Sequence, residues 1–186
     1  TPLGRDLHHA MDQFLKEDPL LGGNAITPLV GGEEAYPLML DSIRAARHHI
    51  HLQTFILGAD EVGRRFMDLL AAKAREGVTV RLMYDSFGST YAILRCFFRP
   101  YRHIPHLRLV PWTQSNVFKR RFQVNLRNHR KVLVVDGREA FTGGLNLARN
   151  NLEHEGRPAI RDYHFHLRGP IVQELQYAFL RDWHFM

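Results

Sequence analysis

The stretch that most constrains the fold is residues 127–137, RNHRKVLVVDG. Its centre holds four consecutive apolar residues, three of them β-branched, which favours a β-strand. Successive side chains of a strand point to opposite faces, so Leu133 and Val135 share one face and Val132 and Val134 the other. Because both faces are apolar, both need cover. The stretch therefore indicates a strand inside a sheet that is flanked by helices.

Hydrophobic periodicity and turn residues place the other elements along the chain. Strands are predicted at 24–30, 50–57, 78–85, 107–112, 130–136, 139–144 and 162–168, and helices at 6–16, 33–47, 61–77, 90–98 and 170–183. Turns are expected at Gly31–Gly32 and at Asp136–Gly137, and Gly77 is expected to end a helix. Strands and helices alternate first and strands dominate later, which predicts an α/β sandwich with a central sheet.

Composition is that of a soluble globular domain with a substantial core. The chain has 186 residues, of which 45% are hydrophobic and 24% charged. No run of about 18 apolar residues occurs, so no segment is expected to span a membrane. The single cysteine, Cys96, excludes an internal disulfide and a cysteine-rich zinc site, and it fits a reducing compartment.

Positive charge is concentrated in one segment. From Ser86 to Val135 there is no Asp or Glu, although ten of the chain's 25 Lys and Arg lie there. A block of one sign indicates an anionic partner, and the alternative is a solvated basic face. Aromatic residues are interleaved with these charges: Phe97, Phe98, Tyr101, Trp112, Phe118 and Phe122. The mixture suits a phospholipid surface or a single-stranded nucleic acid and does not choose between them.

The polar ends of the 127–137 stretch suggest chemistry. His129 and Lys131 are two residues apart, which in a strand places them on one side with Cα atoms about 7 Å apart. A histidine is a nucleophile that is neutral at working pH, and a lysine supplies charge to a phosphate. Gly143–Gly144 allows backbone to approach a ligand closely, and Asn146 adds an amide donor at an expected helix N-terminus.

His129, Lys131, Asp136, Gly143, Gly144 and Asn146 form the pattern His-x-Lys-x4-Asp-x6-Gly-Gly-x-Asn. This resembles the signature motif of the phospholipase D superfamily. From about Gly23 onward, segments such as VGRRFMDLLAAKAREGVTVRLMYDSFGS and RDYHFHLRGPIVQELQYAFLRDW resemble bacterial cardiolipin synthase-type domains. The resemblance implies an α/β/α sandwich with a central mixed sheet. It also implies an N-terminal helical segment at 1–22 and one phospholipase D-like domain at 23–186.

The resemblance implies a role for each motif residue. Family enzymes cleave phosphodiesters through a phosphohistidine, so His129 would be the nucleophile or its acid/base partner. Lys131, Asn146, Gly143 and Gly144 would bind the phosphate oxygens. Asp136, the third catalytic motif residue, would give structural support more than direct chemistry.

Further residues are considered beside the motif. Asp162 resembles the acidic residue that orients the nucleophilic histidine, with a strand-end carboxylate as the alternative. Gln53 lies on a strand that is expected to reach the site. His164 and His166 are read as core or rim histidines, and neither metal nor cofactor is implied.

The family site needs two motifs, and this chain has one. Either the sequence is the first half of a two-motif enzyme, or it is a one-motif subunit that pairs as a homodimer. The absence of an initiator Met at Thr1 and the stop at Met186 favour the first reading. The expected activity is therefore a cardiolipin synthase-like phosphatidyltransferase that works as half of a site.

Two alternatives stay open beside the lipid transferase. One is a metal-independent nuclease or phosphodiesterase, and the other is an inactive half that binds lipid or nucleic acid. The expected partners are an anionic phospholipid or membrane surface and a second motif-bearing half, with nucleic acid as the less favoured partner. The expected location is the bacterial cytoplasm or the periphery of a membrane.

Overall fold

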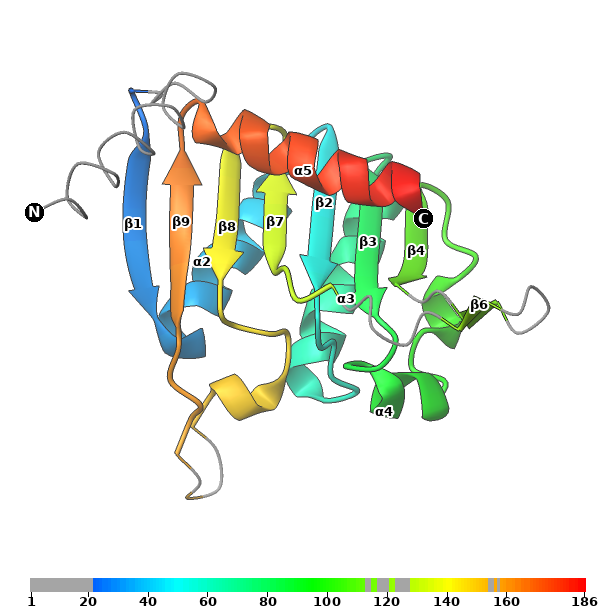
Figure 1. The fold of residues 1–186 in the computed structure, drawn as a ribbon. Helices are drawn as coiled ribbons and strands as arrows, with labels where there is room; N and C mark the ends of the chain where they lie inside the picture. The colour runs from blue at the N-terminus through cyan, green and yellow to red at the C-terminus, as the bar shows by residue number, and fades with distance from the viewer. Residues whose placement is uncertain (1–21, 113–114, 117–120, 123–127, 154–155, 157) are drawn as a thin grey trace, which may run out of the picture.

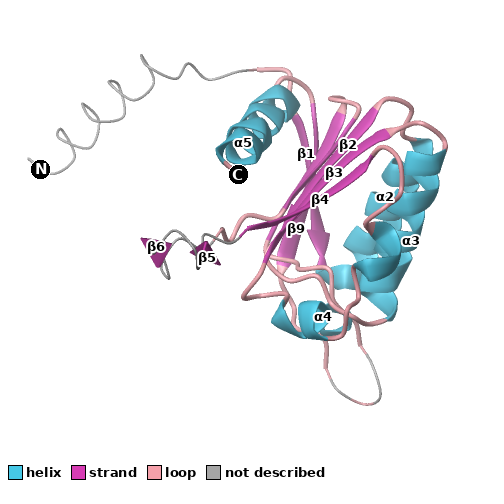
Figure 2. Ribbon diagram, turned by 90° about the vertical axis from the view of Figure 1, so that its right-hand side faces the viewer, coloured by secondary structure: helices cyan, strands magenta, loops and turns pink. Residues whose placement is uncertain are grey.

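The computed structural model describes residues 22–112, 115–116, 121–122, 128–153, 156 and 158–186. A central sheet is covered on one face by two helices and on the other by one helix, in three layers (Figures 1 and 2). This confirms the α/β/α sandwich with a mixed central sheet. The predicted helix at 6–16 lies outside the described residues, as does nearly all of the 1–22 segment.

The elements of the structure follow the predicted order closely. The strands are β1 (Ala25–Val30), β2 (His49–Thr54), β3 (Thr79–Asp85), β4 (Leu107–Trp112), β5 (Ser115–Asn116), β6 (Arg121–Phe122), β7 (Val132–Val135), β8 (Glu139–Gly143) and β9 (Tyr163–Arg168). The α-helices are α2 (Gly31–Ala45), α3 (Glu61–Arg75), α4 (Thr90–Leu94) and α5 (Ile171–Phe185), and the 3-10 turns are η1 (Arg99–Tyr101) and η3 (Arg149–Asn151).

The main sheet has seven strands in the order β1-β9-β8-β7-β2-β3-β4. Strands β2, β3 and β4 are parallel, and every other neighbouring pair is antiparallel. Because β7 runs against β2, the start of β7 lies at the same edge as the ends of β2 and β3. The end of β8 and the start of β9 lie at that edge too, at the bottom of Figure 1. We call it the lower edge.

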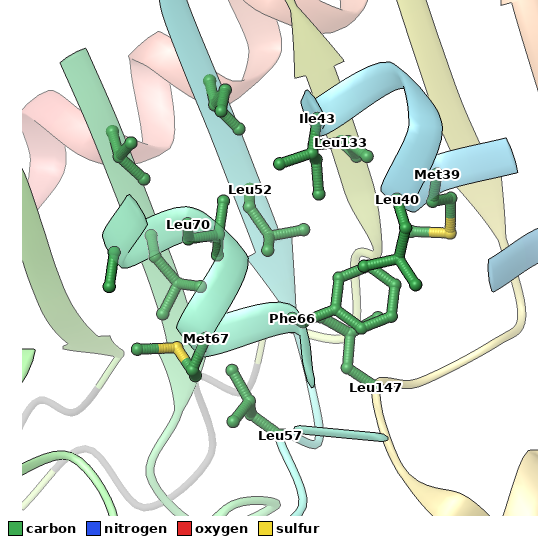
Figure 3. Packing of buried hydrophobic residues seen from close by; sticks show 14 of the residues in the cluster. Met39, Leu40, Ile43, Leu52, Leu57, Phe66, Met67, Leu70, Leu133 and Leu147 are labelled. Carbon is green, nitrogen blue, oxygen red and sulfur yellow. The ribbon is translucent and has the colours of Figure 1, made fainter. Parts of the chain in front are cut away.

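Strand β7 divides two apolar cores, as its sequence predicts. Leu133 and Val135 belong to the large core beneath α2 and α3, where Phe66 is fully buried (Figure 3). Val132 and Val134 belong to the smaller core beneath α5. A strand that is apolar on both faces is thus covered on both faces.

Local signals explain several boundaries. The carboxylate of Asp60 accepts the backbone N–H of Gly63 at the start of α3, and Gly77, with φ of 96°, follows the end of this helix. At the predicted β7–β8 turn, Asp136 and Gly137 have φ of 52° and 65°, and the Arg138 N–H bonds to the Val135 carbonyl. Positive φ at both central residues is the requirement of a type I′ hairpin turn.

Two local predictions are wrong. The helix expected at 90–98 ends at Leu94, because Cys96 takes φ of 53° and the chain turns before η1. Gly31 and Gly32, expected as a separate turn, are the first two residues of α2, where Gly31 has φ of 72°.

Helix α5 packs on the sheet through aromatic contacts. The ring of His51, on β2, stacks on the ring of Phe179 with centroids 4.7 Å apart. Nη1 of Arg81 lies 2.9 Å from Nε2 of His51. Desolvation, with smaller effects of His49 and Arg81, lowers the pKa of His51 to about 3. The His51 ring is therefore neutral in the folded protein at neutral pH.

Within the described residues, no helix has the length and apolarity needed to cross a bilayer.

Candidate active site

His129 lies at the lower edge of the sheet, in the segment just before β7. Its side chain is exposed, and its ring packs against the ring of Phe55 with centroids 4.0 Å apart. Phe55 directly follows β2, the strand that pairs with β7. No described residue forms a hydrogen bond with the ring nitrogens of His129. The exposed ring thus packs on an aromatic platform, and no described residue occupies its nitrogens.

Lys131 is buried beside His129. It is 7% exposed, and its Nζ donates to the backbone carbonyl of His129 at 2.8 Å. The same Nζ lies 5.6 Å from the centre of the Phe55 ring. Desolvation lowers the pKa of Lys131, against the opposing effect of nearby Asp162. In the described part of the chain no carboxylate forms an ion pair with Lys131, so a buried cation lacks a direct counter-ion.

Gly143 and Gly144 bring the end of β8 against the start of β9. A Cβ on Gly144 would lie 2.0 Å from Oδ2 of Asp162, and one on Gly143 would lie 2.4 Å from the Tyr163 carbonyl. Only glycine leaves room for the Asp162 carboxylate at this place. The Gly144 N–H in turn donates to the Tyr163 carbonyl at 2.8 Å. The glycine pair therefore positions Asp162 at the lower edge, near Lys131.

Asp162 does not touch the histidine that it was expected to orient. Its Oδ1 accepts the N–H of Tyr163 at 2.8 Å, and its charge acts on Lys131 and His164. Among the described residues there is no hydrogen bond between Asp162 and His129. The role of Asp162 in orienting His129 stays a prediction, and the observed geometry connects it to the lysine.

Asn146 lies in the loop after β8 and not at a helix N-terminus, since only the three-residue turn η3 follows it. Its Oδ1 accepts the N–H of Ile56 at 3.0 Å, and its backbone carbonyl accepts the hydroxyl of Tyr36 at 2.5 Å. These bonds fasten the loop to the segment after β2 and to α2. Because the amide oxygen is engaged, the NH2 group is the end of this side chain that is left to donate to a ligand.

Asp136 lies at the opposite edge of the sheet from His129 and Lys131. Its carboxylate accepts three backbone N–H groups, from Arg47 at 2.8 Å, His48 at 2.8 Å and His49 at 2.9 Å. Arg47 and His48 lie in the loop between α2 and β2, and His49 is the first residue of β2. The length of β7 therefore separates Asp136 from the other two motif residues. The Asp136 carboxylate connects the end of β7 to the start of β2, the neighbouring strand.

An acidic residue on α5 was missed by the sequence reading. Oδ2 of Asp182 accepts from Gln53 at 3.0 Å, Asn128 at 2.8 Å and Arg130 at 2.9 Å. The two residues that flank His129 are thus fixed to α5, and Gln53 meets the site through Asp182. The contacts join positions 52 to 129 residues apart, so no local pattern could have revealed them.

The two histidines of β9 lie apart from His129. His164 is 1% exposed and lines a small cavity with Lys131 and Gln53, which agrees with its reading as a core histidine. Desolvation lowers the pKa of His164 to about 4; Asp162 opposes this shift and Lys131 adds to it. His166 stacks on Phe141 at 4.6 Å. In the described residues no group of three His, Cys, Asp or Glu side chains is arranged to hold a metal ion.

The fold is that of a phospholipase D-like domain. A solved structure, described as a phospholipase D family member, Nuc from Salmonella typhimurium, superposes with a TM-score of 0.62. The alignment covers 87% of this chain and 95% of that one at 17% sequence identity, so the likeness is one of fold.

Sequence comparison makes the assignment narrower. The family model described as "Cardiolipin synthase, PLD-like domain" matches residues 39–183. The chain is 36% identical over 187 residues to a cardiolipin synthase of Geobacillus thermodenitrificans, and 35% identical over 159 residues to cardiolipin synthase 2 of Bacillus anthracis. The chain belongs to the phospholipase D superfamily and is cardiolipin synthase-like. These alignments cover 100% and 85% of this chain but only 37% and 30% of the relatives.

Proposed function

We propose that this chain contributes one half of the active site of a phosphatidyltransferase of the cardiolipin synthase type. The enzyme would work through a phosphohistidine at His129. The reaction class is phosphodiester cleavage followed by transfer of the phosphatidyl group to the hydroxyl of a second lipid. The family assignment supports the class. The placement of His129, Lys131 and Asn146 at the lower edge supports the roles proposed for them below.

The observation that carries the proposal is the burial of Lys131 without a carboxylate partner. Burying an ammonium group costs free energy unless it is paired, and proteins rarely tolerate such a group without use. A phosphodiester beside His129 would supply the missing negative charge. The lowered pKa of Lys131 reports the same cost, because desolvation is its largest cause. The unpaired lysine therefore favours an anionic substrate over a purely structural role.

His129 would act as the nucleophile in the first step. One ring nitrogen attacks phosphorus, the bond from phosphorus to the leaving alcohol breaks, and a second acid protonates the departing oxygen. In the second step the acceptor hydroxyl loses its proton to that group and attacks phosphorus, which breaks the phosphorus–nitrogen bond and restores His129. Lys131 and the Asn146 amide would bind the non-bridging oxygens, whose charge grows as each step proceeds.

The second acid would come from a second copy of the motif. This chain holds one His-x-Lys, and it spans between 30% and 37% of the length of the relatives above. The rest of a longer chain would supply the second histidine in cis, and a second copy of the domain would supply it in a homodimer. In either arrangement the exposed ring of His129 faces the partner's acid across the phosphate.

The test uses the full-length protein that contains this chain and vesicles of phosphatidylglycerol. We expect cardiolipin and glycerol in equal amounts, with loss of turnover in His129→Ala and in Lys131→Ala. Acid quenching with labelled lipid should leave a phosphoryl adduct on wild-type His129 and none on His129→Ala. Hydrolysis of DNA in EDTA without cardiolipin would instead identify a nuclease. Normal turnover in His129→Ala would refute the assigned role.

A further inference from the structure

An exposed apolar surface lies beside the candidate active site, on α4 and the turn before it. We propose that this α4 patch (Phe87, Tyr91, Ile93, Leu94 and Arg95) docks the protein on an anionic phospholipid bilayer and holds the lower edge of the sheet against the lipid headgroups. The inference rests on the proposed function and adds the element that contacts the membrane. Figure 2 shows α4 at the end of the sheet, apart from the layers of α2, α3 and α5.

Hydrogen-bonded turns flank the short helix α4, which itself covers Thr90–Leu94. The N–H groups of Ser89, Ile93 and Arg95 bond to carbonyls four residues earlier. Residues spaced by three and four along such a backbone lie on one side. Tyr91 and Leu94 have this spacing within α4, and Phe87 precedes them in the turn; we call these three residues the stripe.

The stripe is apolar and faces outward. Phe87 is 64% exposed, Tyr91 63% and Leu94 76%, whereas Ala92 and Ser89 on the inner side are almost fully buried. Leu94 is the most exposed large apolar residue of the described chain. A cluster of large apolar side chains at the surface costs free energy in water, and such clusters mark interaction sites.

One residue, Phe55, connects the segment that carries the stripe to the candidate nucleophile His129. The turn at Gly88 and Ser89 packs on the backbone of Phe55: a Cβ on Gly88 would lie 2.4 Å from the Phe55 carbonyl oxygen, and the Ser89 hydroxyl lies 3.4 Å from it. The ring of Phe55 packs against the ring of His129, with centroids 4.0 Å apart. A bilayer that receives the stripe would therefore present its phosphodiesters at the level of His129.

The charge around the stripe suits an anionic membrane. The guanidinium of Arg95 lies 5.6 Å from the centre of the Tyr91 ring, and no acidic residue occurs from Ser86 to Val135. Arg99 and Arg102 follow on exposed positions. Asp60 and Glu61 line a cavity that Tyr91 shares, but the Asp60 carboxylate already accepts two backbone N–H groups. Cations beside an apolar stripe complement anionic headgroups above acyl chains.

The aliphatic members of the patch decide between lipid and nucleic acid. A platform for single-stranded nucleic acid presents aromatic faces on which bases stack. The most exposed member here is Leu94, and Ile93 is beside it, and neither can stack on a base. Both are suited to the boundary between headgroups and acyl chains, where the apolar side of an interfacial helix sinks about 5–10 Å.

The experiment measures binding of the full-length protein to vesicles of phosphatidylglycerol and phosphatidylcholine by sedimentation. Leu94→Ser removes the most exposed apolar side chain, and we expect about tenfold weaker binding. Arg95→Gln should weaken binding about fivefold on anionic vesicles, with the loss fading at high salt and absent on pure phosphatidylcholine. Leu38→Ser, at a 42% exposed leucine of α2, is the matched control and should bind like wild type.

A second readout connects docking to turnover. The rate on vesicles, divided by the rate on a water-soluble short-chain phosphatidylglycerol, should fall in Leu94→Ser and stay constant in Leu38→Ser. Equal binding by these two variants would overturn the inference. So would a Leu94→Ser change confined to oligomeric mass or to binding of single-stranded DNA, because the patch would then serve a protein or nucleic-acid partner. Absence of cardiolipin with intact, Leu94-dependent vesicle binding would refute the proposed function and keep the docking surface.

Discussion

Replacing Asp136 tests whether the third motif residue supports the fold or the chemistry. The carboxylate accepts three backbone N–H groups from the end of the α2–β2 loop and the first residue of β2, at the far edge of the sheet from His129. Asp136→Ala removes both oxygens that accept the three bonds, and it places alanine, which tolerates left-handed backbone less well than aspartate, at φ of 52°. We therefore expect a large loss of stability and no direct effect on the reacting groups.

The magnitude follows from these contacts. A hydrogen bond to a charged group contributes about 1.5–3 kcal/mol, but the three bonds share one partly exposed carboxylate and do not add. Loss of the carboxylate should cost about 3 kcal/mol, and left-handed backbone at alanine about 1 kcal/mol more. For a domain of this size, 4 kcal/mol lowers Tm by roughly 8–16 °C.

The pH dependence has a defined sign. Desolvation raises the pKa of Asp136, but the three backbone donors lower it by more, so the pKa lies below its ordinary value of 3.8. The unfolded state therefore binds the proton more readily. The stabilisation is fully present above the unfolded pKa and is lost as the pH falls through the lowered folded pKa. Asp136→Ala and wild type should converge in stability at strongly acidic pH.

The assay is urea unfolding at neutral and acidic pH, with turnover measured at a temperature at which each variant is folded. Asp136→Gly is the matched control, because glycine adopts positive φ freely and lacks only the carboxylate. It should recover about 1 kcal/mol relative to alanine. The structural interpretation would be refuted by a folded, stable Asp136→Gly protein that has lost turnover.

Three further predictions concern Lys131, Gly144 and His51. Lys131→Met should abolish turnover yet raise the urea midpoint, because it removes a buried cation without an ion-pair partner. This gain in the midpoint should shrink as the pH rises toward 10.5, the ordinary pKa of lysine, because the wild-type lysine then loses its charge. Gly144→Ala should displace the Asp162 carboxylate and lower kcat at least tenfold, while Gly22→Ala, with open space around it, should not; equal kinetics would contradict the packing. Stability should fall as the pH drops from about 6.5 toward 3, since His51 must take a proton in the unfolded state, and His51→Gln should flatten this slope in urea titrations.

Local patterns were sufficient for most of the fold. The two apolar faces of β7, the end of α3 before Gly77 and the Asp136–Gly137 turn are each determined by neighbouring residues, so the sequence reading placed them correctly. The helix expected at 90–98 failed because Phe97 and Phe98 are drawn into the core, at 7% and 2% exposed, and the backbone turns at Cys96 to place them. Tertiary burial overrode a helical pattern there.

The same burial corrects the reading of the aromatic residues in the basic segment. Phe97, Phe98 and Tyr101 were expected to face an anionic partner, but all three are buried. Phe118 and Phe122 lie outside the residues whose side chains the structure describes. The exposed apolar side chains of that segment are instead those of the α4 patch, whose short helix gave a weak signal on its own.

The sequence by itself determined that His129 and Lys131 stand two residues apart at the start of a strand covered on both faces, because strand periodicity and apolar content are local properties. Only the tertiary structure decided that the lysine is buried without a carboxylate partner, that Asp136 accepts three backbone N–H groups from residues 47–49, and that Asp182 fixes the segment around the histidine. These facts depend on chain segments more than 50 residues apart, whose contacts are set by the packing of sheet and helices.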